Sequence, residues 1–315
     1  MLTEPNNKNI SLTVAIPAYN EEQNIGGVLK DLLSQTRSGF ALKEIVVYSD
    51  ASTDETNRIV KRFHRRSPVI NLKIGKRRCG KIFRLNQIFR SNKSDVLVVL
   101  DADIGLVGNR FLQRLAGALA SDDKAKMAVA HQIPLRSKNF MGKVVYASYL
   151  MWDFIRLSVP GRDHVQNFYG AATAYRSSFA KKLHIPPKLT EERLYIYLRA
   201  KEGNGFRYCD SAKILYWPVS TLPEFIKQAK RSFGKNQPIL DKIFGPGSDS
   251  NYVIPWKYKL RGIVKSFYHQ PFYTPLALAF NFFLSKLTLK TPVRNSPLWD
   301  ISLSTKKPFN YEKIL

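Results

Sequence analysis

Two kinds of hydrophobic pattern alternate along the first 120 residues. Compact β-branched runs have about the length of buried parallel strands, and the segments between them repeat apolar residues at helical spacing. The predicted strands are 12–19, 44–48 and 95–100. The predicted helices are 21–35, capped by Asn20, a second after 53, then 81–89 and 109–120. This order predicts a doubly wound α/β fold with a mostly parallel sheet flanked by helices.

Acidic residues stand directly behind two of the predicted strands. Asp50 follows 44–48, and the pair Asp101 and Asp103 follows 95–100. In open α/β sheets, ligands bind in the crevice outside the carboxyl ends of the strands. A third acidic group, Glu191–Glu192, opens a later helical pattern. The three groups together indicate metal-assisted chemistry on a nucleotide, although a lone Asp-x-Asp triplet also suits a solvated turn.

The chain lacks the common sequence motifs that bind phosphate. No glycine-rich dinucleotide fingerprint follows the first strand, and no P-loop motif occurs in the sequence. Mg²⁺ or Mn²⁺ would serve instead, because hard cations bind one or two carboxylates together with the phosphate oxygens of a substrate. Residues i and i+2 of a tight turn can both face the crevice. Asp101 and Asp103 are therefore the candidate metal ligands.

The charge of the chain bears on its partners. Lys and Arg number 50 against 24 Asp and Glu, a formal charge of +26, and residues 61–94 contain no acid. Such an excess suits nucleic acid, anionic lipid or a phosphorylated substrate. A nucleic-acid-binding protein needs aromatic side chains among its cations. Phe63, Phe83 and Phe89 occupy helix core positions instead, so nucleic acid is disfavoured.

Two cysteines, Cys79 and Cys209, stand alone without metal-ligand spacing, so neither a disulfide framework nor a zinc site is predicted. The N-terminal residues 1–10 have no apolar stretch of the signal-peptide type. We therefore expect the catalytic part to lie in a reducing compartment, on the cytoplasmic face of a membrane.

Six short motifs occur in an order that resembles the inverting family 2 glycosyltransferases of the GT-A fold. They are PAYNEE (17–22), SDASTDET (49–56), CGKIFRLN (79–86), DAD (101–103), TEERL (190–194) and QAKRS (228–232). The resemblance spans about residues 12–235 and is more specific in its N-terminal half.

The resemblance implies a donor site with named residues. Those implied to line the base and ribose pocket are Pro17, Tyr19, Glu21, Tyr48 and Asp50. Asp50 would accept a hydrogen bond from a base N–H, although Ser49 stands where the family usually has a second Asp. Lys81 would help to neutralise the diphosphate, and Asp101, Ala102 and Asp103 would bind the nucleotide and the metal.

The resemblance also implies a catalytic base. Inversion requires a carboxylate that takes the proton of the attacking hydroxyl. Glu192 stands at the position of the family's Asp, and Glu191 is the alternative; both also suit the N-terminus of a helix. Gln228 and Arg231 resemble a QxxRW motif, in which Arg231 would compensate the leaving group; an exposed amphipathic helix is the alternative. Ser232 replaces the Trp, which disfavours a long-chain polymerase.

The chain divides by composition into a catalytic part, 1–235, and a basic, aromatic part, 236–315. The helical stretch 140–157 favours a core-facing helix, with an acceptor groove as the alternative. The apolar piece 271–285 is shorter than the roughly 20 residues of a spanning helix. With cations on both sides, it suits a segment lying on an anionic membrane surface. Packing on the catalytic part and membrane spanning remain open.

The sequence therefore predicts a metal-dependent enzyme. It would move a sugar from a nucleoside diphosphate sugar, with UDP favoured, onto a hydroxyl of a lipid-linked or saccharide acceptor. Ser49, Glu192 and Ser232 depart from the family pattern. These departures leave a catalytically inactive, membrane-associated scaffold as an alternative function.

Overall fold

The strands of the chain form one sheet of mixed direction. The computed structural model describes residues 10–232, 236–290, 298 and 302–309. Its strands are β1 (Ile10–Ala18), β2 (Phe40–Ser49), β3 (Ile70–Ile74), β4 (Val96–Leu100), β5 (Ile104–Leu106), β6 (Met127–Pro134), β7 (Ala172–Arg176) and β8 (Phe206–Tyr216). Within this described part they make an eight-stranded sheet in the order β3-β2-β1-β4-β7-β6-β8-β5.

The N-terminal half of the sheet is parallel, as the sequence predicts. β1 lies between β2 and β4 and runs parallel to both, and β3 continues the same direction beyond β2. In the other half, β7 runs antiparallel to β4 and β6, and β5 runs antiparallel to β8. The sequence predicts none of the strands after β4. β5 has only three residues, which is too few to display a period.

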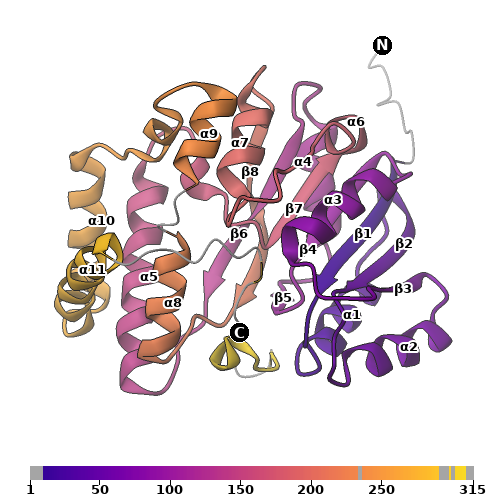
Figure 1. The fold of residues 1–315 in the computed structure, drawn as a ribbon, viewed down its shortest axis with the longest axis horizontal. Coiled ribbons are helices and arrows are strands. Elements are labelled where there is room, and N and C mark those ends of the chain that lie inside the picture. The colour runs from indigo at the N-terminus through magenta and orange to yellow at the C-terminus, as the bar shows by residue number, and fades with distance from the viewer. Residues whose placement is uncertain (1–9, 233–235, 291–297, 299–301, 310–315) are drawn as a thin grey trace, which may run out of the picture.

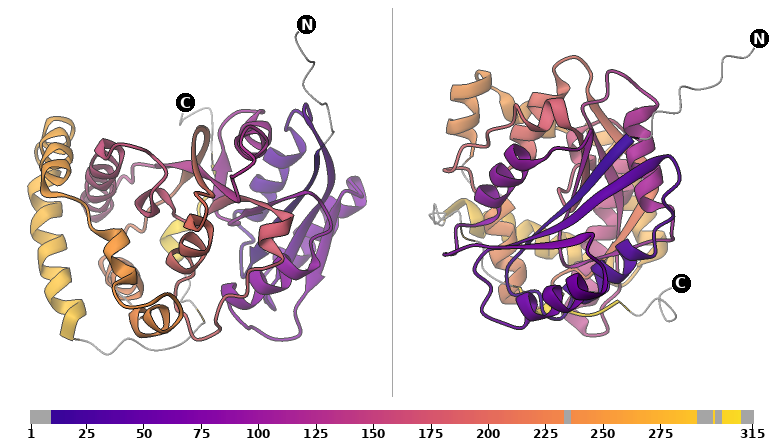
Figure 2. Two further views of the ribbon diagram at one scale, coloured as in Figure 1. Left: turned by 90° about the horizontal axis from the view of Figure 1, so that it is seen from above. Right: turned by 90° about the vertical axis from the view of Figure 1, so that its right-hand side faces the viewer.

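Helices cover both faces of the sheet (Figures 1 and 2). They are α1 (Ile25–Leu33), α2 (Thr56–Arg66), α3 (Lys81–Ser91), α4 (Phe111–Ala120), α5 (Phe140–Ser158), α6 (Ser177–Ala180), α7 (Arg193–Lys201), α8 (Leu222–Ser232), α9 (Gln237–Phe244), α10 (Trp256–His269) and α11 (Tyr273–Lys290). Short 3-10 turns are η1 (Val165–Asn167), η2 (Ser248–Tyr252) and η3 (Leu303–Thr305).

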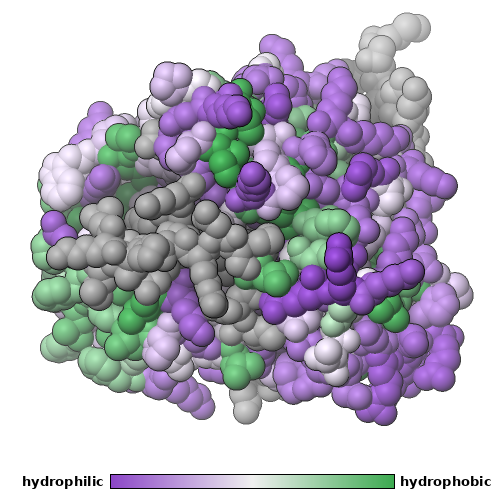
Figure 3. Space-filling model, in the orientation of Figure 1, coloured by the Kyte–Doolittle hydropathy of each residue, from purple (hydrophilic) through white to green (hydrophobic). Residues whose placement is uncertain are grey.

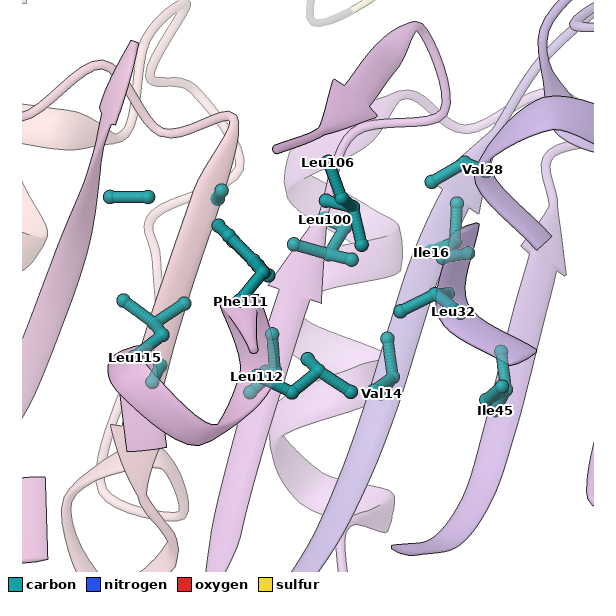
Figure 4. Close-up of a cluster of buried hydrophobic side chains, with 14 of the residues drawn as sticks. Val14, Ile16, Val28, Leu32, Ile45, Leu100, Leu106, Phe111, Leu112 and Leu115 are labelled. Atoms are coloured by element: carbon teal, nitrogen blue, oxygen red, sulfur yellow. The ribbon is translucent and has the colours of Figure 1, made fainter. Parts of the chain in front are cut away.

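Strand residues alternate between two cores. Val98 and Leu100 of β4 join the cluster under α1 and α4, whereas Leu97 and Val99 join the cluster under α3 and α7. Figure 4 shows the first cluster, with Leu112 of α4 beside the strands. Fully burying a leucine or valine side chain contributes about 1.5–3 kcal/mol. Both faces of β4 are apolar, and in the observed register its Leu97 and Val98 pair with Thr13 and Val14 of β1.

The predicted cap of the first helix is wrong. The helix begins at Ile25 rather than at 21, and Asn20 has a left-handed φ of 52°. The Asn20 side chain accepts a hydrogen bond from the backbone N–H of Thr53 at 2.9 Å, and the N–H of Glu21 donates to the Thr56 hydroxyl at 2.7 Å. The loops after β1 and β2 therefore bind each other, and this contact delays the start of the helix.

The C-terminal helices pack against α5, the helix predicted at 140–157. Val145 and Ile155 of α5 are buried, which confirms a core-facing helix. The piece 271–285 falls mainly in α11, which packs along α5 with Ala277 buried. Its Asn281 amide donates to the Ser148 hydroxyl at 2.8 Å. No described helix is long and apolar enough to cross a membrane.

The contact between α10 and α5 depends on one glycine. A Cβ on Gly262 would lie 2.5 Å from the Ile155 backbone nitrogen and 2.6 Å from its Cα. We expect Gly262→Ala to lower the free energy of unfolding by about 1–3 kcal/mol, because the backbones must separate. The control is Gly117→Ala in α4, where a Cβ meets nothing within 4 Å and helix propensity favours alanine. Urea unfolding of both variants tests this; equal stability would contradict the packing.

Candidate functional site

The acidic residues predicted behind the strands meet at one edge of the sheet. The N–H of Asp50 donates to the carbonyl of Ala18 at the end of β1 at 2.8 Å. The N–H of Asp101, just past β4, donates to Ala171 at 2.8 Å, beside the first residue of β7. The carboxyl ends of β1, β2 and β4 thus form the crevice that the sequence predicts for ligands.

A lysine links two of the predicted acidic groups. Lys81 is the first residue of α3, and its Nζ lies 2.7 Å from Asp101 Oδ1 and 3.6 Å from Glu192 Oε1. Lys81 and Glu192 stand 111 residues apart in the sequence, with Asp101 between them. The structure therefore brings together the predicted diphosphate, metal and base positions.

Burial and charge set the protonation of this cluster. Burial opposes the charge of Lys81, but the carboxylates of Asp101 and Glu192 outweigh it and raise the pKa of Lys81 to about 12. Burial raises the pKa of Asp103, and the neighbouring Asp101 adds to this rise. Burial also raises the pKa of Glu192, although Lys81 opposes the rise. A nearby cation therefore stabilises the ionised form of these buried carboxylates.

The two candidate bases differ in their partners. Glu191 is paired with the guanidinium of Arg193 and also accepts a hydrogen bond from the Arg193 N–H at 2.9 Å. Arg193 in turn donates to the Phe168 carbonyl at 3.2 Å. Glu192 is buried, and its Oε2 accepts no hydrogen bond from the described residues. Glu192 therefore retains the capacity to accept a proton, and Glu191 serves to hold Arg193.

Asp50 holds the loop that precedes α3. Its carboxylate accepts hydrogen bonds from the N–H groups of Cys79, at 2.9 and 3.1 Å, and Gly80, at 2.7 Å. It also pairs with Arg84 Nε at 2.7 Å. These contacts position the helix end that carries Lys81. No local pattern in the sequence indicates the role of Arg84, and contact between Asp50 and a base N–H remains a prediction.

The other predicted pocket residues separate into two groups. The Arg78 guanidinium stacks over the Tyr19 ring at 3.9 Å, and Ala102 is buried in the turn between the two aspartates. Pro17 is paired in register with Tyr48, but the structure does not bring Tyr48 to the cluster. The Tyr48 hydroxyl meets Ser91, at the far end of α3 from Lys81, at 2.5 Å. We conclude that Tyr48 supports α3 rather than the crevice.

The QxxRW-like segment forms α8, on the other half of the molecule. Gln228 is half-buried, and its Oε1 is a buried atom without a hydrogen bond from the described residues. Arg231 belongs to the last turn of α8, and its side chain lies outside the described part of the structure. The role of Arg231 therefore stays a prediction.

A residue near the C-terminus joins the cluster without any sequence signal. Lys306 Nζ contacts Glu21 Oε1, and 285 residues separate the two in the chain. Burial and the nearby charge of Asp103 raise the pKa of Glu21 to about 8, although Lys306 opposes the rise. On the other side of the same segment, Lys307 borders a cavity of about 410 Å³. The remaining residues that line this cavity are Arg136, Ser137, Lys138, Asn139 and Trp217.

The residues present suit a divalent cation that shares its ligands with a substrate. Within the described ranges, no cluster of three or more His, Cys, Asp or Glu side chains is placed to hold a metal ion. Asp101 and Asp103 offer two carboxylates, the number that Mg²⁺ commonly takes from protein when phosphate oxygens complete its shell. Because burial disfavours the charge of Asp103, a cation there would be favourable.

Comparisons with known proteins identify the family of the chain. Residues 13–183 match the model of Glycosyl transferase family 2. A search of curated proteins gives no match.

Several solved structures share the fold. The mannosyltransferase PcManGT from Pyrobaculum calidifontis, in complex with GDP-Man and Mn²⁺, has a TM-score of 0.54 at 19% identity, over 91% of this chain and 82% of that one. S. aureus TarS 1-349 has 0.51 at 16%, over 83% and 72%. Glucosyl-3-phosphoglycerate synthase from Mycobacterium tuberculosis, with Mn²⁺, UDP and phosphoglyceric acid, has 0.51 at 16%, over 78% and 80%.

Proposed function

We propose that this chain, which belongs to glycosyl transferase family 2, transfers a sugar from a nucleoside diphosphate sugar to an acceptor hydroxyl. The transfer inverts the configuration at the anomeric carbon. The observation that carries the proposal is the meeting of Lys81, Asp101 and Glu192 at the carboxyl end of the sheet. A donor diphosphate needs cations and metal-binding carboxylates there, and inversion needs a base close by.

The reaction assigns each residue a role. The acceptor oxygen forms its bond to the anomeric carbon while the bond from that carbon to the phosphate oxygen breaks, and the diphosphate departs with the bonding electrons. Glu192 takes the proton of the acceptor hydroxyl on its Oε2, which has no other hydrogen-bond partner among the described residues. Lys81 holds Asp101 and Glu192 in place and offers its charge to the departing diphosphate.

The metal would bind beside Asp103 and Asp101. A divalent ion there would neutralise charge on the departing diphosphate. Support comes from the two carboxylates behind β4 and from structural neighbours that contain Mn²⁺.

A thermal-shift screen of UDP-, GDP- and dTDP-sugars, each with and without Mn²⁺, tests the donor proposal. We expect one nucleotide to raise the melting temperature only when Mn²⁺ is present, because ligand binding to the folded state stabilises it. At 100 times the dissociation constant the gain is about 2.7 kcal/mol. No shift with any nucleotide sugar, with or without Mn²⁺, would contradict the proposed function.

We also propose that the enzyme works at an anionic membrane surface, on a lipid-linked acceptor. One face of α10 is apolar and exposed, and its residues repeat at helical spacing: Trp256, Leu260, Val264 and Phe267. On the opposite side, Gly262 packs against Ile155 of α5, and the Ser266 hydroxyl lies 2.9 Å from the Thr274 hydroxyl of α11. The cations beside the apolar stripe are Lys257, Lys259, Arg261 and Lys265. Figure 3 shows hydrophobic residues gathered at the left, over α10 and α11.

This surface combines the two attractions of an interfacial helix. Apolar side chains enter the headgroup region, and each nearby Lys or Arg contributes about 1 kcal/mol against anionic lipid. The sequence predicts the membrane-facing segment at 271–285. The regular exposed stripe lies on α10 instead, because one side of α11 packs against α5.

Val264→Asp tests the surface, because Val264 is 60% exposed and its replacement leaves the core unchanged. We expect binding to vesicles containing phosphatidylserine to fall at least about tenfold, since a carboxylate repels the same lipids that the lysines attract. Ile74→Asp is the matched control, because Ile74 is 52% exposed on β3 of the other half. Equal loss in both variants, or in neither, would contradict a specific surface on α10.

The nucleic-acid alternative finds no support in the fold. Phe89 is fully buried and Phe63 packs against the core, so neither ring is available for base stacking. The prediction of a core position for Phe83 is wrong, because its side chain is 43% exposed, but a single exposed ring does not form a row of stacking positions.

A further inference from the structure

A segment close to the C-terminus lies across the donor crevice. Residues 302–309 include the turn η3, and Figure 1 shows this yellow segment between α8 and β5. The backbone N–H of Ser304 donates to Glu224 Oε1 at 3.1 Å, and its hydroxyl contacts the other oxygen of the same carboxylate. The N–H of Ser220 donates to the Ser304 hydroxyl at 2.9 Å. The segment is thus anchored to the start of α8.

In this anchored segment, the side chains of two adjacent lysines point in different directions. Lys306 enters the crevice, where its side chain is only 13% exposed and its Nζ contacts Glu21. Its positive charge also acts on Asp103, whose pKa it lowers against the larger effect of burial. Lys307 turns away and lies over the Trp217 ring, 5.5 Å from the ring centre. The chain therefore carries a natural matched pair of lysines.

Lys306 places an ammonium group on Glu21, and its charge acts on the neighbouring Asp103, a carboxylate that a metal ion would use. An ammonium is a compact charge with three donors, and it favours the ionised form of any carboxylate nearby. A divalent cation at Asp103 would repel it, strongly so in a buried site. The Lys306 ammonium and the divalent cation therefore oppose each other's binding next to Asp103.

We propose that Lys306 and the divalent cation compete for the carboxylates of Glu21 and Asp103, so that segment 302–309 leaves the crevice when the metal and nucleotide enter. This inference rests on the proposed donor site. The segment then acts as a strap that covers the carboxylates until the donor arrives. The contacts that hold the segment include those with Glu224, Ser220, Glu21 and the Trp217 ring, and the metal nucleotide must displace the one at Glu21.

Mn²⁺ binding to the full chain without nucleotide tests the competition. We expect Lys306→Met to bind Mn²⁺ at least tenfold more tightly than the wild type, measured from the electron paramagnetic resonance signal of free Mn²⁺. Lys307→Met removes the same charge from the next residue and should leave the affinity within twofold. Equal or weaker binding in Lys306→Met overturns the inference. Absence of Mn²⁺ binding in every variant, with or without UDP and GDP, overturns the proposed function as well.

Hydrogen exchange of the wild-type protein tests the release itself and needs no variant. We expect amides of 302–309, including the Ser304 N–H, to exchange at least tenfold faster after Mn²⁺ and the bound nucleoside diphosphate are added. Amides of β4 should show no such acceleration. Slower exchange of 302–309, or an unchanged rate at saturating nucleotide, would show that the segment stays in place and would overturn the inference.

Discussion

We expect Asp103→Asn to reduce the proposed Mn²⁺-dependent sugar transfer by about a thousandfold, the scale of removing a group that stabilises charge in the transition state. The replacement keeps the size of the side chain and removes its negative charge, so the metal loses a ligand while the core around Ala102 and Ile104 is unchanged. Steady-state rates over a range of Mn²⁺ concentrations measure the effect. The loss should appear both in turnover and in the affinity for Mn²⁺.

Asp95→Asn is the matched control for this variant. Asp95 lies just before the other end of β4, where it accepts hydrogen bonds from the Ser11 N–H at 2.9 Å and hydroxyl at 2.6 Å. We expect it to alter stability slightly and to leave Mn²⁺-dependent rates unchanged. Near-normal transfer by Asp103→Asn would remove the metal role that the structure suggests for this carboxylate.

Glu192→Gln lowers kcat by about a hundredfold to ten-thousandfold, the usual contribution of a general base. The amide has nearly the same shape but accepts no proton from the acceptor hydroxyl. Donor binding should persist, because Lys81 keeps its contact with Asp101. Glu191→Gln is the neighbouring control, and its effect should be smaller and act through Arg193. A larger loss in Glu191→Gln would exchange the two roles.

The pH profile gives the same test a second readout. A base works only when ionised, and burial raises the pKa of Glu192 above the ordinary value of a glutamate. Activity of the wild type should therefore fall as the pH drops through this raised pKa, at a higher pH than for an exposed carboxylate. The residual activity of Glu192→Gln should lose this acid limb, whereas Glu191→Gln should keep it.

Much of the donor half was predictable because its signals are local. Strand β4 is an uninterrupted apolar run that is buried throughout, β1 and β2 carry buried apolar runs at 14–16 and 45–48, and each strand ends next to polar or acidic residues. The topology rule for parallel sheets then brings Asp50 and Asp101 to one edge. The family resemblance supplied Lys81 and Glu192, and the structure brings these two side chains within 3.6 Å of each other.

The remainder depends on contacts between distant segments. Tyr48 follows the same alternation as its neighbours in β2, and only the position of Ser91 shows that its hydroxyl points away from the crevice. Asp50 finds Arg84 and the loop before α3, 29 or more residues away. Lys306 carries no periodic pattern and reaches Glu21 through the fold alone. Such side chains have no local signal, because their partners are set by tertiary packing.

The central claim is that a divalent cation and a nucleoside diphosphate bind together at Asp103. Its most direct measurement is an anomalous difference map from crystals containing Mn²⁺ and the nucleoside diphosphate that the thermal-shift screen selects. We predict one strong peak in contact with the Asp103 carboxylate and with phosphate oxygens of the nucleotide. A nucleotide bound at another edge of the sheet, or a manganese peak away from Asp103, would contradict the account.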